Sequence, residues 1–145
     1  MLNNFYAEDL VLLDIEVKEK KDLFEIISKK IKELGVTDDE NGVVEDFMKK
    51  DKNTVTYLGN EYAIPHIRSS RINSNIILFI RMTNSISWSD DDRARYIFSI
   101  IIKEEDRNTH IEALKRISKK VLDKKSSDIF KNSKDKEEIL SIIKS

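Results

Sequence analysis

The sequence contains only two histidines, and one of them, His66, directly follows the only proline, Pro65. Proline fixes its own φ angle and pushes the preceding residue, Ile64, toward an extended conformation, so the backbone constrains His66 before any tertiary contact forms. Imidazole is the side chain best suited to carry a labile group near neutral pH. His66 is therefore a candidate nucleophile, although a lone histidine is more often a structural or surface residue.

The second histidine, His110, follows a predicted buried strand and opens a predicted helix. Thr109 and Glu112 match the Thr-x-x-Glu pattern of a capping box, which places His110 in the first helical turn. Free backbone N–H groups and the positive end of the helix dipole attract anions at such a position. Functional groups in α/β folds gather beyond the carboxyl ends of strands. The spacing leaves open whether the two histidines meet there.

Other patterns indicate no further chemistry. The consecutive carboxylates Asp90–Asp92 point in different directions, which favours a solvated turn over a metal site. Ser69–Ser70 lacks the glycine pattern of a nucleophile elbow, and Gly59 is too isolated for a phosphate-binding loop. We expect Trp88 and Phe98 to belong to the core.

The composition narrows the class of protein. A chain of 145 residues predicts one domain, and 26 basic against 27 acidic residues provide no overall field for nucleic acid or an anionic membrane. The absence of cysteine excludes disulfides and thiolate sites. The stretch Met1–Tyr6 lacks the features of a signal peptide, and the longest apolar runs are too short to cross a bilayer. We expect a cytoplasmic protein that does not insert into a membrane.

The expected strands are short and apolar. They are Val11–Ile15, Ile76–Ile80 and Tyr96–Ile102, and the last two read as strands covered on both faces. Asn84–Ser85 is expected to break the second strand, with Ile86–Trp88 as a separate short extended piece.

Helical spacing of apolar residues predicts helices before, between and after these strands. The first helix is expected over Lys20–Leu34 and ends at Gly35, and the second over Gly42–Lys50, with Val43, Val44, Phe47 and Met48 buried. The third has one apolar face formed by Ile111, Leu114, Ile117 and Val121. Two shorter helices are expected around Asp128–Phe130 and over Asp135–Ile143. This order predicts an α/β fold, in which a single mixed β-sheet is covered by helices on both faces of one compact domain.

The segment from Thr54 to His66 resembles a known active-site signature. Its elements Thr56-Tyr57-Leu58-Gly59 and Ala63-Ile64-Pro65-His66 are similar to those of the mannitol/fructose type of IIA component, from the bacterial phosphoenolpyruvate-dependent sugar phosphotransferase system. The Thr-Tyr-Leu-Gly element is typical of the mannitol branch. Downstream, Asp91–Arg95 and Asn108–Ile111 follow that branch in order and spacing, so the resemblance extends over essentially the whole chain.

The resemblance implies a phosphocarrier of residues 1–145 without a metal or other cofactor. His66 would accept a phosphoryl group from the carrier protein HPr and pass it to a IIB component, and His110 would hydrogen-bond the phosphoryl group or its acceptor ring. Lys50 stands where the family often has a phosphate-contacting arginine, and it keeps the charge without the planar fork. Glu61 and Ile67 depart from glycines that are common in the motif.

Such a carrier needs an accessible histidine with an apolar rim, for which Ile64, Ile67 and Ile72 are candidates; Ile64 fits a buried strand equally well. Three roles remain open: uptake of mannitol or a related hexitol or fructose, a regulatory IIA-like module whose phosphorylation controls a protein partner, and a degenerate member that no longer carries phosphate. Retention of both histidines argues against the third.

Overall fold

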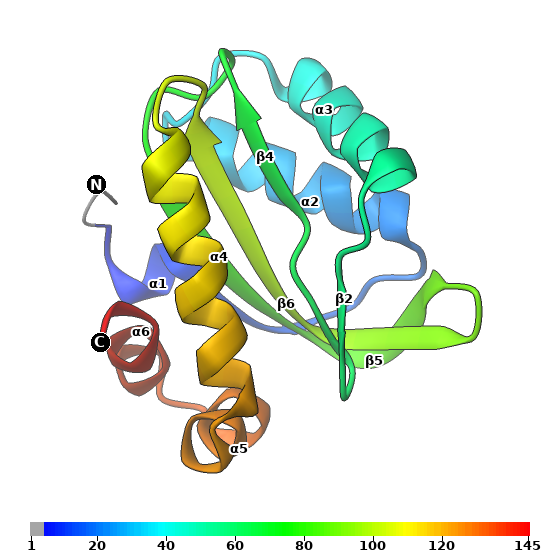
Figure 1. Ribbon diagram of the computed structural model, residues 1–145, viewed down its shortest axis with the longest axis vertical. Coiled ribbons are helices and arrows are strands. Elements are labelled where there is room, and N and C mark those ends of the chain that lie inside the picture. Colours follow the sequence, from blue (N-terminus) through cyan, green and yellow to red (C-terminus); the bar gives the residue numbers. More distant parts are fainter. Residues whose placement is uncertain (1–4) are drawn as a thin grey trace.

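A long antiparallel hairpin forms the centre of the sheet in the computed structural model, which describes residues 5–145 (Figure 1). Strands β5 (Ile76–Ser89) and β6 (Asp92–Lys103) pair along their length, with Phe79 opposite Phe98. The expected break at Asn84–Ser85 is wrong: β5 continues through it, and the pairing only shifts register between Arg81 and Ile86. Such an irregularity accommodates the polar residues Asn84 and Ser85 within the strand, while the outer end of the hairpin stays paired.

The other strands make the sheet mixed. Its order is β1-β5-β6-β3-β2, with β4 also paired to β6. Strand β1 (Val11–Ile15) is parallel to β5, and both β3 (Tyr62–Ala63) and β4 (His66–Ser69) are parallel to β6. Strand β2 (Tyr57–Gly59) is antiparallel to β3. The predicted single mixed sheet is confirmed, and the signature segment supplies β2, β3 and the first residue of β4.

Helices cover both faces of the sheet, as predicted. Helix α2 (Lys20–Glu33) lies behind the sheet in Figure 1, with α3 (Glu40–Asn53) packed against it and beside β4. Helix α4 (Arg107–Leu122) lies in front and packs on β6. The remaining helices are α1 (Ala7–Leu10), α5 (Lys124–Asn132) and α6 (Lys136–Lys144). Helix α3 begins earlier and ends later than expected; the earlier start is explained by the Asp39 side chain, which caps the helix by accepting a hydrogen bond from the Gly42 N–H.

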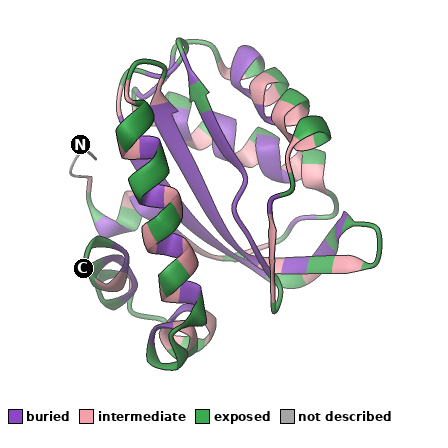
Figure 2. Cartoon of the chain, in the orientation of Figure 1, coloured by how far each residue is buried: buried purple, intermediate pink, exposed green. Residues whose placement is uncertain are grey.

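Aromatic residues fill the core on both sides of the hairpin, whose buried strands are visible in Figure 2. Trp88 contacts Phe24 on α2, and Phe98 contacts Phe130 on α5. Both Trp88 and Phe98 are buried, as expected. Phe47 is also fully buried, whereas Val44 and Met48 are only half-buried, so α3 presents a narrower apolar stripe than expected. Among residues 5–145 no helix is both long and apolar enough to cross a membrane.

Candidate active site

His66 opens β4 and is held by its own backbone. The preceding Ile64 and Pro65 connect β3 to β4, and the carbonyl oxygen of Pro65 accepts a hydrogen bond from the N–H of Ile100 on β6. The side chain is 6% exposed, and its Nδ1 lies 2.6 Å from the carbonyl oxygen of Ile64. Because a carbonyl oxygen can only accept, Nδ1 carries the proton. Nε2 therefore keeps the free electron pair of the ring.

His110 lies beside His66. The two ring centroids are 5.1 Å apart and the ring planes cross at 66°. His110 is 8% exposed, and within the described part of the chain its Nε2 has no hydrogen-bond partner. An unpaired buried polar atom costs about 1–3 kcal/mol, so a ligand oxygen that reached this nitrogen would be stabilised. The fold thus brings together the two histidines whose convergence the sequence left open.

The start of α4 differs from the sequence expectation. The helix begins at Arg107 rather than after Thr109, with Asp106 as its N-cap residue. His110 is the fourth helical residue, and its backbone N–H already donates to the carbonyl of Asp106. The predicted Thr109/Glu112 capping box is wrong because the helix starts earlier, just after Asp106, whose carboxylate accepts a hydrogen bond from the Asn75 side chain. His110 therefore offers its side chain, not its backbone N–H, to an anion.

Burial keeps both imidazoles neutral. Loss of solvent lowers the pKa of His66, the hydrogen bond to Ile64 opposes this effect, and the positive charge of Lys50 adds to it. Burial lowers the pKa of His110 to about 4, with His66, Lys50 and Arg68 as smaller causes. At neutral pH the site therefore holds a neutral ring with an available Nε2.

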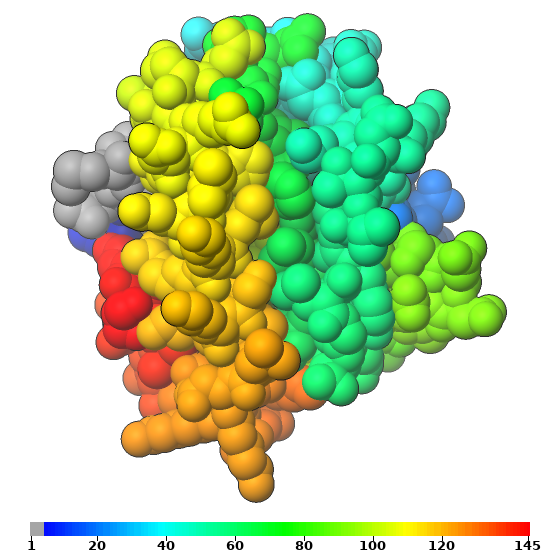
Figure 3. Space-filling view, in the orientation of Figure 1, coloured from blue at the N-terminus to red at the C-terminus, as the bar shows by residue number. Residues whose placement is uncertain are grey.

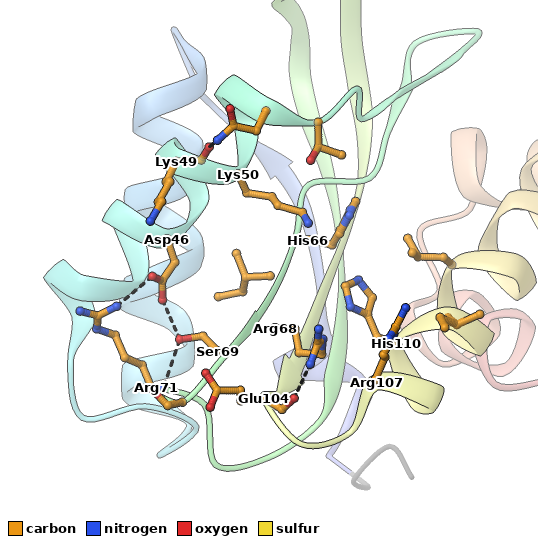
Figure 4. A pocket seen from close by; sticks show the side chains of 16 residues that line it. Asp46, Lys49, Lys50, His66, Arg68, Ser69, Arg71, Glu104, Arg107 and His110 are labelled. Carbon is orange, nitrogen blue, oxygen red and sulfur yellow. Dashed lines mark hydrogen bonds and ion pairs between the residues drawn. The ribbon is translucent and has the colours of Figure 1, made fainter.

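A cleft of about 630 Å³ gives access to the two rings. It runs between α3 and α4, visible as the groove between the yellow and cyan-green surfaces in Figure 3. Lys50 reaches in from α3 with its ammonium group directed toward His66, while His110 enters from α4 (Figure 4). The structure thus places all three of the predicted site residues, His66, His110 and Lys50, in one cleft.

Further cations line this cleft and were not found from the sequence, among them Arg68 and Arg107. Arg68 follows His66 by two residues in β4, so strand alternation puts both on one face. Arg107 precedes His110 by three residues in α4, which places both on one side of the helix. These two spacings could have identified Arg68 and Arg107 from the sequence, once strand β4 and the start of α4 had been located.

The apolar rim comes from a different element than expected. Ile64, Ile67 and Ile72 are 7%, 2% and 4% exposed, so they are core residues and cannot form an exposed rim. For Ile67 the reason is the pairing of β4 with β6, which places it in the covered sheet. Ile67 still lines the cleft from below, but the more exposed apolar lining comes from Ile111, 39% exposed, and the half-buried Leu114 of α4.

Comparison with known proteins decides the family. A family model described as "Phosphoenolpyruvate-dependent sugar phosphotransferase system, EIIA 2" matches residues 4–145. The chain belongs to this family. Members of the EIIA 2 family are phosphotransfer components, and the resemblance of the His66 segment to that family is thereby confirmed.

Relatives of two kinds resemble this EIIA 2 chain. The fructose-specific EIIABC component of Bacillus subtilis is 26% identical over 81% of the chain, and the mannitol-specific EIICBA component of Vibrio cholerae is 26% identical over 90%. The chain spans only about a fifth of the length of these two proteins, 19% and 20% respectively. The Nitrogen regulatory protein of Bradyrhizobium diazoefficiens is 24% identical, over 98% of the chain and 94% of its own length.

Solved structures share the fold. The Nitrogen Regulatory Protein IIA-Ntr from Neisseria meningitidis superposes with a TM-score of 0.84 at 25% identity, over 93% of each chain. IIA mannitol from Escherichia coli superposes with a TM-score of 0.79 at 18% identity, over 97% of this chain and 99% of that one. The second likeness shows the fold alone.

Proposed function

We propose that this protein is a phosphocarrier in which His66 accepts a phosphoryl group and passes it on. The observation that carries the proposal is the 2.6 Å contact between His66 Nδ1 and the Ile64 carbonyl oxygen, which leaves Nε2 unprotonated. The unpaired Nε2 of the adjacent His110 ring supports it, because a phosphoryl oxygen would satisfy that atom. Membership of the EIIA 2 family supports the same reaction class.

The chemistry follows from the tautomer. In the accepting step the lone pair of His66 Nε2 forms a bond to phosphorus, the bond between phosphorus and the donor nitrogen breaks, and its electron pair returns to the donor ring. The attacking ring becomes more positive, and the Ile64 carbonyl stabilises that charge through Nδ1–H. Because Nε2 carries no proton, no general base is required. The step back out, to the next acceptor, is the same displacement in reverse.

His110 and Lys50 would act on the oxygens of the moving group. A loose transition state carries charge on three equatorial oxygens, and the protein contributes mainly positioning and charge stabilisation. A neutral His110 can donate one hydrogen bond, and the Lys50 ammonium can offset charge from the opposite wall. Neither role requires a metal or another cofactor.

The partners belong to the proposal. We take HPr as the phosphoryl donor and a IIB component as the acceptor. A solved complex of Escherichia coli mannitol IIA with phosphorylated IIB superposes with a TM-score of 0.79 at 18% identity, which shows that another protein of this fold binds a IIB partner. The transported sugar would be mannitol, a related hexitol or fructose. We place the protein in the cytoplasm, as one phosphocarrier domain over residues 1–145 that binds neither nucleic acid nor membrane.

The His66→Ala variant tests the acceptor. With phosphoenolpyruvate, enzyme I and HPr, the wild-type protein should gain one acid-labile phosphate, detected by phosphorus NMR, and the variant should gain none, because it lacks the nucleophile. Circular dichroism should show that the variant is folded. Undiminished labelling of the variant would place the acceptor elsewhere.

A regulatory role is the second candidate. It is supported by the likeness to Nitrogen regulatory proteins, one of which is 24% identical over 98% of this chain, while another, a solved structure, superposes with a TM-score of 0.84 at 25% identity. The discriminating test is the fate of the phosphorylated protein. Transfer to a purified IIB component favours uptake, whereas a stable phosphohistidine that changes binding to another protein favours regulation.

A further inference from the structure

Three hydrogen bonds connect Trp88, near the outer end of the long hairpin, to the candidate acceptor. The indole Nε1–H of Trp88 donates to the hydroxyl oxygen of Thr56 at 2.9 Å. The carbonyl oxygen of Thr56 accepts a hydrogen bond from the N–H of Ile64 at 2.8 Å. The carbonyl oxygen of Ile64 lies 2.6 Å from Nδ1 of His66. The series therefore ends at the contact that sets the tautomer of His66.

Thr56 is the link between the hairpin and the signature segment. Its side chain binds Trp88, and its carbonyl extends the pairing of β2 with β3 by one residue, to Ile64. On the N-terminal side, Val55 is 87% exposed, so packing of Val55 cannot fix the position of Thr56. The hydrogen bond between Thr56 and Trp88 is buried, where water cannot replace either partner. The position of the Thr56 carbonyl therefore depends on Trp88.

Trp88 is held in place by packing. Strand β5 continues through Asn84–Ser85 and extends past β2 (Figure 1), and this outer part carries Trp88. Ile86 and Trp88 lie on one face of the strand by alternation, and both are buried. The indole meets Phe24 of α2 edge-on, with ring centroids 6.4 Å apart, and Phe24 stacks on Phe47 of α3. The indole N–H is therefore a donor with a fixed direction.

We propose that Trp88 is a positioning residue for the acceptor, which acts through Thr56 to keep the proton of His66 on Nδ1. This inference rests on the proposed phosphocarrier function and adds to it a residue outside the lining of the cleft. The hydrogen bonds of an imidazole ring determine which of its nitrogens carries the proton. When the Ile64 carbonyl shifts, some of the rings carry the proton on Nε2, and those rings have no lone pair with which to attack phosphorus.

The test compares four variants. Thr56→Val removes the hydroxyl with little change of shape, whereas Thr56→Ser keeps the hydroxyl and loses only a methyl group. Trp88→Phe removes the donor and keeps an aromatic ring. The control is Tyr62→Phe, which deletes another hydroxyl of the signature segment, hydrogen-bonded to the Ser127 hydroxyl at 2.8 Å, and leaves Thr56 unchanged.

The first measurement is long-range proton–nitrogen NMR of the histidine side chains at pH 7.5, with the two rings assigned from His110→Gln. The wild type, Thr56→Ser and Tyr62→Phe should all show His66 with the proton on Nδ1. Thr56→Val and Trp88→Phe should show a mixed population, in which part of the His66 rings carry the proton on Nε2.

The second measurement is the rate of transfer from phosphorylated HPr. Thr56→Val and Trp88→Phe should accept the phosphoryl group about tenfold more slowly than the wild type, because the nucleophile is less well prepared and less well placed. Thr56→Ser and Tyr62→Phe should accept at nearly the wild-type rate. Urea unfolding should show that Thr56→Val and Tyr62→Phe are both folded and both less stable than the wild type, since each loses a hydrogen bond.

An unchanged tautomer or an unchanged transfer rate in Thr56→Val overturns the inference, and this variant decides the outcome if Trp88→Phe does not fold. Equal slowing by Thr56→Val and Tyr62→Phe also overturns it, because the bond to Trp88 would then serve only stability. Labelling of the wild type tests the proposed function separately. If neither HPr nor phosphoramidate phosphorylates it, the phosphocarrier function fails, while the NMR comparison still decides whether Trp88 sets the tautomer of His66.

Discussion

The Nδ1 atom of His66 lies 2.6 Å from the Ile64 carbonyl oxygen, and in the proposed transfer this contact would leave Nε2 as the nucleophilic nitrogen. The sequence identified His66 through Pro65 and the surrounding signature, but it could not identify the tautomer. Ile64 and Pro65 lie in the short connection between β3 and β4, two strands that both run parallel to β6, and the carbonyl of Ile64 in this connection reaches the ring of His66. The backbone segment that positions His66 therefore also sets the tautomer of its ring.

His110→Ala should slow phosphoryl transfer without removing the acceptor. His66 remains in place as the nucleophile, but the phosphoryl oxygens lose an aligned donor, which typically lowers rates by about 100-fold. Rapid-quench measurements of transfer from phosphorylated HPr to this protein, and from it to a IIB component, measure the effect. Wild-type rates in both directions would mean that His110 has no part in the transfer.

The histidines should also make the fold sensitive to mild acid. The pKa of His66 is lowered by burial, and that of His110 is lowered to about 4, from an unfolded value of 6.5. Below pH 6.5 the unfolded chain therefore binds protons that the folded chain does not, so stability is present above that pH and falls as pH falls toward 4. Urea unfolding should show His110 contributing a loss of about 1–2 kcal/mol between pH 7.5 and 5.

The matched variant for this pH dependence is His110→Gln. It removes one of the two titrating rings, so its stability should fall less over the same interval. Asp39, Asp106 and Asp123, whose pKa values are also lowered, begin to contribute only near their ordinary value of 3.8, below the range compared. Identical slopes for variant and wild type between pH 7.5 and 5 would show that His110 does not titrate as described.

At the scale of elements, the cleft depends on how α3 is attached to β4. Asp46 on α3 accepts from Ser69 at the end of β4 and from Arg71 just beyond it. Arg71 passes so close to α3 that a Cβ atom on Gly42 would lie 2.2 Å from its Nε. Lys50 follows Asp46 by one helical turn, so this bridge fixes the wall that carries Lys50 relative to the strand that carries His66.

Asp46→Ala should therefore affect transfer more than stability. The loss of two partly exposed hydrogen bonds should cost about 1 kcal/mol in urea unfolding, while misplacement of the Lys50 wall should slow transfer by about tenfold or more. The control is Asp51→Ala, since Asp51 lies on the same helix, binds Lys20 of α2 and has a similar exposure, 23% against 22% for Asp46. If both variants slow transfer equally, the bridge to β4 has no special role.

At the scale of the whole molecule, a buried arginine joins the C-terminal helices to the sheet. Arg81 on β5 is 6% exposed and donates to the carbonyl oxygens of Phe130, at 2.8 Å, and Ser133, at 2.7 Å. These carbonyls lie at the end of α5 and at the residue after it. The guanidinium thus satisfies helix-end carbonyls that would otherwise lack partners.

Arg81→Met should destabilise the protein by about 2–3 kcal/mol, because it leaves the buried carbonyl of Phe130 without a partner. The measurement is the midpoint and slope of urea unfolding. The control is Arg93→Met, because Arg93 also makes two hydrogen bonds, to Ser85, but is exposed. Its replacement should cost less than 1 kcal/mol. Equal losses in the two variants would contradict the role assigned to Arg81.

Patterns confined to neighbouring residues were sufficient for much of this molecule. Helical spacing in Lys20–Leu34, the apolar run Ile76–Ile80 and the Pro65-His66 pair each depend on side chains a few positions apart, and the structure places them in a helix, a buried strand and the cleft. The continuation of β5 through Asn84–Ser85 was missed because it depends on pairing with β6 on both sides of these polar residues, and the residues near Asn84 in the sequence give no sign of that pairing.

Tertiary structure decided what the cleft contains. His66 and His110 meet because β4 pairs in parallel with β6 and α4 then packs back against β6. The same arrangement buries Ile67, exposes Ile111 and assembles cations from α3, β4 and α4. The sequence by itself identified His66 as the candidate acceptor and predicted many of the helices and strands, since both follow from short-range backbone and apolar patterns. Only the fold determined the partners of that residue, because distant segments approach one another through strand pairing and helix packing.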